Sequence, residues 1–124
     1  MAILLFEANV RQMPAVAVID LSGEIDGFSE AALNAAYSRA TDGNQKSVLL
    51  NFNKVEYMNS TGIALIVGLL AQARKSGRRL LTCGLSDHYQ EIFRITRLSD
   101  FMNIYTDEAS ALAEVDGGVQ AVKQ

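Results

Sequence analysis

Short apolar runs alternate with segments of helical spacing along this chain, and this alternation constrains its fold more than any other feature. Two apolar runs come first, at residues 3–6 and 15–21, and each later run is followed by a segment whose apolar residues recur every three or four positions. Parallel strands need a crossover of this kind, usually a helix. The sequence therefore predicts a single α/β domain: a mostly parallel sheet of about four to five strands with four helices, in the order β β α β α β α β α.

The strands are expected where apolar and β-branched residues are bounded by turn residues. Pro14 precedes the run at 15–21, and proline is tolerated at the first position of a strand. Ser22 and Gly23 are expected to end that strand, and Asn53 and Lys54 to turn the chain after the next one. The expected strands are an edge strand at 3–6 and further strands at 15–21, 47–52, 78–84 and 101–106.

Four helices are expected from capping residues and from the spacing of apolar positions. The second helix should run from Ser60 or Thr61 to Lys75 and be closed by Gly77, a residue type favoured just beyond a helix end. The other spans are 30–40 with Ser29 as N-cap and 41–44 as the stop, about 88–96 behind Ser86 and Asp87, and 107–116 ended by Gly117 and Gly118. The residues expected to face inward are Ala32, Leu33, Ala36 and Tyr37 in the first helix, Ile92, Phe93 and Ile95 in the third, and Ala109, Leu112 and Ala113 in the fourth.

The totals exclude several classes of protein. The 124 residues suit one domain, expected at 1–116, with 117–124 as a frayed C-terminal tail. A net charge of −3 and a sequence pI near 5.0 disfavour nucleic acid, which selects basic surfaces. The longest apolar run, 63–71, is shorter than the ~20 residues of a membrane helix, and no signal peptide is recognisable. We expect a cytoplasmic protein without membrane insertion, in which the basic cluster at 74–79 marks a helix end.

Catalytic and metal-binding groups are scarce. The single cysteine, Cys83, lies in an apolar run and is interpreted as a small core residue and not as a reactive thiol. The single histidine, His88, stands alone at a helix start, where a surface role is commoner than catalysis. Glu24 and Asp26 would share one side of an extended strand, but nothing else converges on them. We expect no catalytic residue, no metal site, no cofactor and no enzymatic activity.

The most informative stretch is VEYMNSTGIALI, residues 55–66, where a strand passes into the second helix. Asn59, Ser60 and Thr61 are all good capping residues. The start of a helix also favours an anion, because its free N–H groups and its dipole are positive there. Ser60 does not fit a nucleophile elbow, since Met58 stands where that motif has glycine. Residue chemistry alone leaves two interpretations of this stretch. It is either a plain helix cap or a phosphorylation site whose phosphate the fold would tolerate.

The helix that follows poses a second choice. It is apolar on nearly every side between residues 63 and 70, with Ala64, Gly68 and Ala71 in one row and Ile63, Val67 and Leu70 in another. A helix that covers one face of a sheet needs only one apolar stripe. The helix is therefore either deeply packed or presents an exposed surface to a partner.

These residues resemble the STAS domains of bacterial anti-sigma-factor antagonists. That family has an Asp-Ser-Ser/Thr-Gly run after a strand, and VEYMNSTGIALI is similar to it. LSGEID, residues 21–26, resembles a second family run that ends in an acidic residue, and residues 80–112 are similar to the family's next strand, helix and final strand. The resemblance covers about residues 3–115 and implies a STAS-type fold in the element order given above.

The resemblance also implies a partner switch. Ser60 falls on the family's phosphorylated serine, and Asp26 falls on the acidic position near the phosphoserine loop. The unphosphorylated domain would bind an anti-sigma factor that is also a serine kinase, phosphorylation of Ser60 would release that partner, and a PP2C-type phosphatase would reset the switch. The residues implied to surround Ser60 at the partner-binding surface are Met58, Asn59, Thr61, Gly62 and Ile63.

One residue departs from the family pattern: Asn59 stands where the family has Asp. Asn caps a helix as well as Asp does, but it offers the kinase no carboxylate, and it removes a like charge beside the added phosphate. The alternative function is therefore a STAS interaction module without phosphorylation, such as a transporter accessory subunit or a scaffold in stress signalling.

Overall fold

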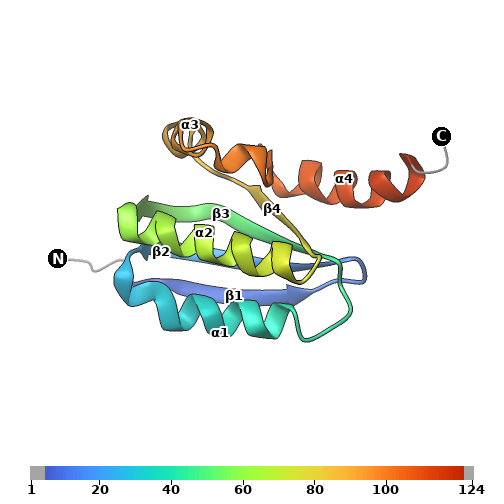
Figure 1. The fold of residues 1–124 in the computed structure, drawn as a ribbon, viewed down its shortest axis with the longest axis horizontal. Helices are drawn as coiled ribbons and strands as arrows, with labels where there is room; N and C mark the ends of the chain where they lie inside the picture. Colours follow the sequence, from blue (N-terminus) through green and yellow to red (C-terminus); the bar gives the residue numbers. More distant parts are fainter. Residues whose placement is uncertain (1–4, 122–124) are drawn as a thin grey trace.

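The computed structural model describes the backbone of residues 5–121 and the side chains of residues 5–115. The strands form one five-stranded sheet, and Figure 1 shows helices packed against it. The strands are β1 (Glu7–Gln12), β2 (Val16–Ile25), β3 (Ser47–Met58), β4 (Arg79–Cys83) and β5 (Asn103–Tyr105). The helices are α1 (Glu30–Ala40), α2 (Ser60–Lys75), α3 (Asp87–Ile95) and α4 (Glu108–Ala121), with short 3-10 turns at Gly27–Ser29 and Leu98–Asp100.

The sheet follows the chain order β1-β2-β3-β4-β5. Strand β1 pairs antiparallel with β2, and every later pair is parallel. This is the α/β class, the element order and the mostly parallel sheet that the sequence predicts. The carboxyl ends of β2, β3 and β4 therefore meet at one end of the domain, where α2 begins.

Two clusters of buried residues lie on opposite faces of the sheet. The larger cluster packs α1, α2 and α3 against the sheet, and in it the Phe52 and Phe93 rings meet edge to face with centroids 6.1 Å apart. The smaller cluster packs Ala111 and Val115 of α4 against residues of β2, β3 and β4. Residues 16–19 of β2 and 48–50 of β3 alternate between the two clusters. These runs are continuously apolar, as is typical of strands covered on both faces.

The edge strand differs from its predicted position. Residues 5 and 6 are not in a strand, and residues 3 and 4 lie outside the described part of the chain. The edge strand is instead β1, in which half-buried Ala8 and Val10 alternate with exposed polar residues. Its sequence, EANVRQ, is mostly polar because only one of its faces is covered, and so it does not form an apolar run.

Strands β2 and β3 run farther than predicted, because two predicted turns are bulges. Their pairing passes from Asp20 with Asn51 to Ser22 with Lys54, and then to Glu24 with Tyr57. Strand β3 thus gains a residue at each of two register shifts, a change that a strand absorbs without ending. Gly23, at φ 85°, supplies the left-handed conformation at one of them.

Helix α2 matches its prediction at both ends, and Gly77 closes it at φ 73°. Helix α1 has Leu33, Ala36 and Tyr37 inward as predicted, but Ala32 is exposed and Ala40 takes the fourth inward position. Ser29 precedes α1 without capping it through its side chain.

The inward residues of the two last helices were only partly predictable. In α3, Phe93 is buried and Ile92 half-buried, but Ile95 is 64% exposed. Two positions along a helix turn a side chain by about 200°, so Ile95 lies on the face opposite Phe93. In α4 the inward residues are Ala111, Leu112 and Val115, and not Ala109 or Ala113. The prediction that Gly117 and Gly118 end α4 is wrong, since the helix continues to Ala121. Residues 122–124 of the predicted tail lie outside the described residues.

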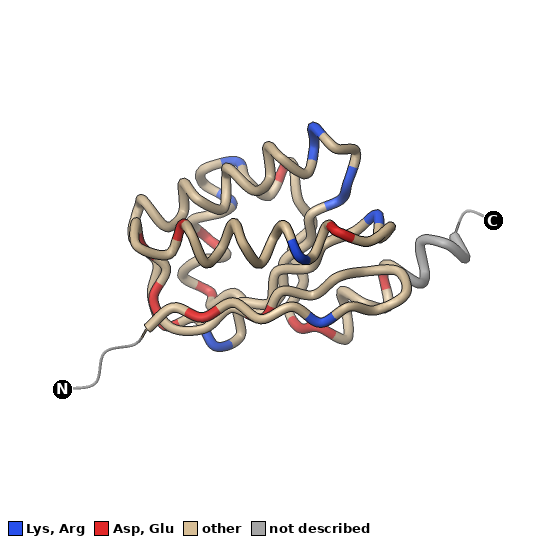
Figure 2. The backbone as a smooth tube through the Cα atoms, turned by 90° about the horizontal axis from the view of Figure 1, so that it is seen from below, with Lys and Arg blue, Asp and Glu red and all other residues tan. Residues whose placement is uncertain are grey.

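Charged residues are divided unevenly between the two ends of the domain, and Figure 2 marks their positions along the backbone. One end collects the last turns of α1 and α2 and the starts of β3 and β4, with basic residues that suit the negative ends of the helix dipoles. These are Arg39, Lys46, Arg74, Lys75, Arg78 and Arg79. The opposite end, where α2 begins, carries Glu24, Asp26, Glu30 and Glu56. The basic cluster thus marks helix ends, as predicted.

Candidate functional site

The junction between β3 and α2 places Ser60 at the first position of a helix. The N-cap is Asn59, whose Oδ1 accepts a hydrogen bond from the Gly62 N–H at 2.8 Å. The first helical bond runs from the Ile63 N–H to the Asn59 carbonyl at 3.0 Å. Because Asn59 serves as the cap, Ser60 does not, and its exposed side chain makes no hydrogen bond to another described residue.

Gly62 brings the end of β2 against the start of α2. A Cβ atom at Gly62 would lie 2.1 Å from the Ile25 carbonyl oxygen, closer than any two such atoms can approach. In the same place the Asn59 N–H donates to that Ile25 oxygen at 3.2 Å. Only glycine fits here, because the Ile25 backbone lies against its Cα. This contact fixes where the helix starts relative to the sheet.

Asp26 belongs to the same surface, but it acts through its own loop. Its Oδ1 accepts from the Phe28 N–H at 2.9 Å, and its N–H donates to the Ser29 Oγ at 3.0 Å. This reciprocal capping box holds the 3-10 turn Gly27–Ser29. A Cβ at Gly27 would lie 3.5 Å from the Thr61 Cγ2, so the turn packs beside the first turn of α2. The structure thus brings the Asp26 loop and the Ser60 region together.

Tyr89 of α3 is a supporting residue that the sequence reasoning missed. Its buried hydroxyl accepts from the Met58 N–H at 2.8 Å and lies 3.2 Å from the Met58 carbonyl oxygen, to which it donates. Tyr89 thus supplies hydrogen-bond partners to the backbone N–H and carbonyl of Met58, the last residue of β3. Tyr89 is separated from Met58 by about thirty positions, and no local spacing indicates the contact.

Replacing Tyr89 by phenylalanine should destabilise the domain by about 1–3 kcal/mol, because the buried Met58 N–H loses its partner. Equilibrium urea unfolding of the wild type and the variant measures this difference. Tyr57→Phe is the matched control, since Tyr57 is 53% exposed and makes no hydrogen bond among the described residues. Equal free energies of unfolding for the two variants would show that the Tyr89 hydroxyl does not stabilise the fold.

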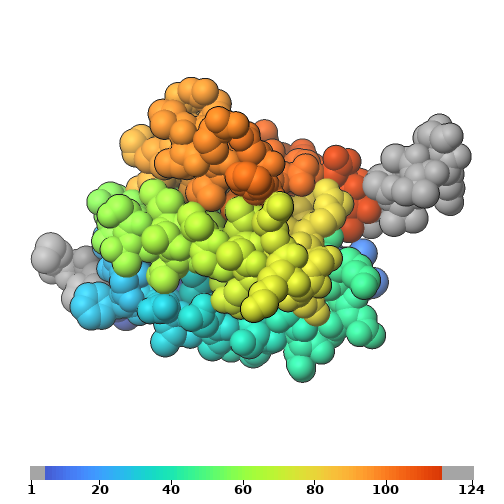
Figure 3. All heavy atoms as spheres, viewed as in Figure 1, coloured from blue at the N-terminus to red at the C-terminus, as the bar shows by residue number. Residues whose placement is uncertain are grey.

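The outer face of α2 is exposed beside the Ser60 region, and Figure 3 shows this helix lying between α1 and the segment that contains α3. Ile66, Leu69, Leu70 and Ala73 are buried. Ala64, Val67, Gly68 and Ala71 face outward, and Ile63 is half-buried. The row of Ala64, Gly68 and Ala71 is therefore exposed along its whole length. The row of Ile63, Val67 and Leu70 is divided between the core and the surface.

The other chemically distinctive residues do not form a site. Cys83 is buried, and burial raises the pKa of its thiol to about 11, so it is a core residue as predicted. His88 is exposed and stacks edge to face on Tyr89, with ring centroids 4.9 Å apart. In the part of the chain that the structure describes, no group of three His, Cys, Asp or Glu side chains could hold a metal ion, and no helix is long and apolar enough to cross a bilayer.

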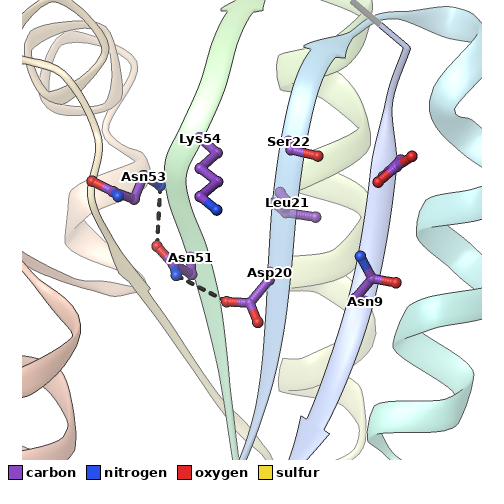
Figure 4. A pocket seen from close by; sticks show the side chains of 8 residues that line it. Asn9, Asp20, Leu21, Ser22, Asn51, Asn53 and Lys54 are labelled. Carbon is purple, nitrogen blue, oxygen red and sulfur yellow. Dashed lines mark hydrogen bonds between the residues drawn. The ribbon is translucent and has the colours of Figure 1, made fainter.

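A polar hollow lies on the sheet face that α4 leaves uncovered (Figure 4), and Ser60 is not among the residues that line it. Asp20 bridges strands there, accepting from Asn51 Nδ2 at 2.9 Å and from Arg11 Nη2 at 2.9 Å. Arg11 also bonds Glu108 of α4. The hydrogen bond from Arg11 holds the pKa of Asp20 below its usual range. This network links β1, β2, β3 and α4 beside the hollow, and it engages Asp20 and Asn51 of the hollow's lining.

Comparison with known proteins identifies the fold and a set of relatives. The model of the STAS domain family matches residues 7–111. The anti-sigma-B factor antagonist of Staphylococcus aureus is 29% identical over 86 residues, which cover 69% of this chain and 80% of that protein.

Two solved structures share the fold. SpoIIAA of Bacillus in its phosphorylated form matches with a TM-score of 0.67 and 24% identity, over 87% of this chain and 98% of that one. A sulfate transporter family protein from Wolinella succinogenes matches with a TM-score of 0.75 and 18% identity, over 89% and 93%. At these identities the structures show a common fold only.

Proposed function

This chain belongs to the STAS domain family, and we propose that it is an anti-sigma-factor antagonist whose partner binding is controlled by phosphorylation of Ser60. The proposal draws on the relatives named anti-sigma-B factor antagonists. Its partners would be an anti-sigma factor with serine kinase activity, acting in the cytoplasm, and a PP2C-type phosphatase that restores the free hydroxyl.

The observation that carries the proposal is the free hydroxyl of Ser60 at the first position of α2. Asn59 supplies the cap, so modification of Ser60 removes no hydrogen bond that the helix needs. A protein kinase requires such an accessible hydroxyl. Thr61 is also exposed, but its Cγ2 packs beside Gly27, which makes it the more constrained of the two.

A phosphate on Ser60 would change the surface without unfolding the domain. It adds about −1.5 to −2 charges at neutral pH, in a position where the dipole of α2 favours negative charge. A partner that covers Ser60 would then have to enclose a dianion, and an unmatched charge at an interface costs several kcal/mol. The partner would be released while the fold persists.

The residue before the serine fits this chemistry. Asn59 caps α2 through the same oxygen that an aspartate would use, but it carries no charge. Aspartate there would place a carboxylate beside the new phosphate and oppose it. The neutral cap thus favours the phosphorylated state on electrostatic grounds, and any guidance of the kinase must come from other residues.

The chain would be the substrate of a kinase and not itself an enzyme. No carboxylate, imidazole or other base hydrogen-bonds the Ser60 hydroxyl among the described residues. The single histidine, His88, is stacked on Tyr89, and the Cys83 thiol is buried. Asp26 is committed to the capping box of its turn. The site offers a docking surface and a modifiable hydroxyl.

The experiment that tests the proposal uses the anti-sigma-factor kinase of the source organism that binds this chain in a pairwise screen. Incubation with that kinase and ATP should yield one phosphate, mapped to Ser60 by mass spectrometry. Thr61→Ala should still be phosphorylated and Ser60→Ala should not. Absence of phosphate from Ser60, together with wild-type binding by Ser60→Asp, would favour an unphosphorylated interaction module.

That second function has one supporting observation, the fold shared with the sulfate transporter family protein. The fold by itself does not separate the two functions, because SpoIIAA also has it. The genes beside this one discriminate: a kinase-type anti-sigma factor or a PP2C phosphatase supports the switch, and a transporter operon supports the accessory module.

A further inference from the structure

Phe28 is held in solvent at the end of the domain where Ser60 lies. It is 98% exposed, more than any other large apolar side chain of the described residues. Exposed apolar side chains are common singly, but a phenylalanine with almost no contact with its own chain is not explained by the fold. Deleting its ring would cost the folded domain nothing that the structure shows.

The turn that carries Phe28 is rigid. The Phe28 N–H is bonded to Asp26 Oδ1 at 2.9 Å, and the Ser29 N–H to the Asp26 carbonyl at 3.0 Å. Ser29 is itself buried, and its hydroxyl reaches the Glu24 carbonyl at 3.3 Å. The backbone that carries the ring is therefore held by hydrogen bonds, and little of its conformational freedom remains to be lost when the ring is covered.

The surroundings of Phe28 indicate the chemistry of what would cover it. The concavity beside Phe28 is lined by the apolar Leu5 and Phe6 and by the acidic Glu24 and Asp26. Glu30 follows in the first turn of α1. The neighbouring Gly27 packs beside Thr61, one residue from the proposed phosphorylation site. Phe28 thus lies on an apolar surface with acidic residues at its edge, close to the proposed phosphorylation site.

We propose that Phe28 is the apolar anchor of the partner interface, inserted into a pocket of the anti-sigma factor that is lined by apolar side chains and rimmed by Lys or Arg. This inference rests on the proposed function, and it names the residue that determines which partner fits. Aromatic residues that fill a pocket supply a large share of interface affinity. The acidic rim then attracts the complementary basic rim and speeds association.

The test measures binding of the screened anti-sigma-factor kinase to unphosphorylated protein by calorimetry. Phe28→Ala should weaken binding about ten- to a hundredfold, as the loss of a buried aromatic side chain requires, and Phe28→Leu should weaken it less. Phe101→Ala is the matched control, because Phe101 is 54% exposed and lies against Arg74 at the basic end. Its affinity should stay within about twofold of the wild type.

Charge reversal tests the rim separately. Glu24→Lys should slow association at low salt, and this effect should fade as salt is raised. Asp42→Lys makes the same change of charge at the opposite end and should leave the association rate unchanged. Equal effects of both reversals would mean that only net charge matters, and would overturn the proposed rim.

The outcomes separate this inference from the proposed function. If Ser60→Asp abolishes binding but Phe28→Ala binds as the wild type does, the switch stands and the anchor is wrong. If Phe28→Ala loses binding while Ser60→Asp does not, the anchor stands and the switch is wrong. A homodimer of this chain that Phe28→Ala dissociates, with kinase affinity unchanged, would assign the ring to a second copy and overturn the anchor.

Discussion

Gly62→Ala is expected to lower the free energy of unfolding by about 3 kcal/mol, the upper part of the usual range for inserting an atom into a filled space. The new Cβ would lie 2.1 Å from the Ile25 carbonyl oxygen and 2.7 Å from its carbon. Both are backbone atoms, so no side chain can rotate to make room. Relief requires α2 to move away from β2, which breaks the bond between Asn59 and Ile25.

Gly68→Ala is the matched control in the same helix. A Cβ at Gly68 meets nothing within 4 Å, and alanine is a better helix former than glycine by roughly 1 kcal/mol. The two substitutions are chemically identical and should shift the urea midpoint in opposite directions. A Gly62→Ala variant as stable as the wild type would show that the helix start is not fixed against β2, and that the site geometry described above is wrong.

The helix that carries the site was the most predictable element of the chain. Its start is predicted by Asn59, Ser60 and Thr61, and its end by Gly77, because capping depends on residues that are adjacent in sequence. The parallel order of the sheet followed in the same way from the strand-helix alternation. Local chemistry therefore placed Ser60 at the start of α2 before any tertiary contact was known.

The features that escaped prediction depend on contacts between distant segments. The bulges opposite Asp20 and Gly23 arise from the pairing of β2 with β3, and they turn two apparent chain reversals into continuous strand. The Tyr89 bond to Met58 joins α3 to β3. Ser29 has the sequence of a cap for α1, yet it pairs with Asp26 in a turn of its own. Propensity cannot decide such cases, because tertiary contacts choose between two acceptable local structures.

Gly62 illustrates how a family resemblance and a physical explanation differ. The resemblance placed it in a recognisable run of residues, as part of the surroundings of Ser60. The structure gives its reason, which is the close approach of the Ile25 carbonyl. The role of Ser60 is of another kind. Its hydroxyl makes no hydrogen bond to another described residue, so its proposed importance lies in its modification by a partner.

Phosphorylation of Ser60 is expected to weaken binding of the anti-sigma factor by roughly a hundredfold or more, since the partner must cover a dianion where it covered a hydroxyl. The domain should remain folded, because Asn59 still caps α2 and the helix dipole favours the phosphate. Ser60→Asp should reproduce part of this loss and Ser60→Ala should bind as the wild type does. Thermal unfolding of each form separates loss of binding from loss of fold.

The most direct test of the switch is therefore the dissociation constant of the anti-sigma factor, measured by calorimetry for this protein before and after stoichiometric phosphorylation at Ser60. The account predicts tight binding before the modification, and a constant about a hundred times larger after it, with an unchanged unfolding transition. Equal dissociation constants for the two folded forms would contradict it.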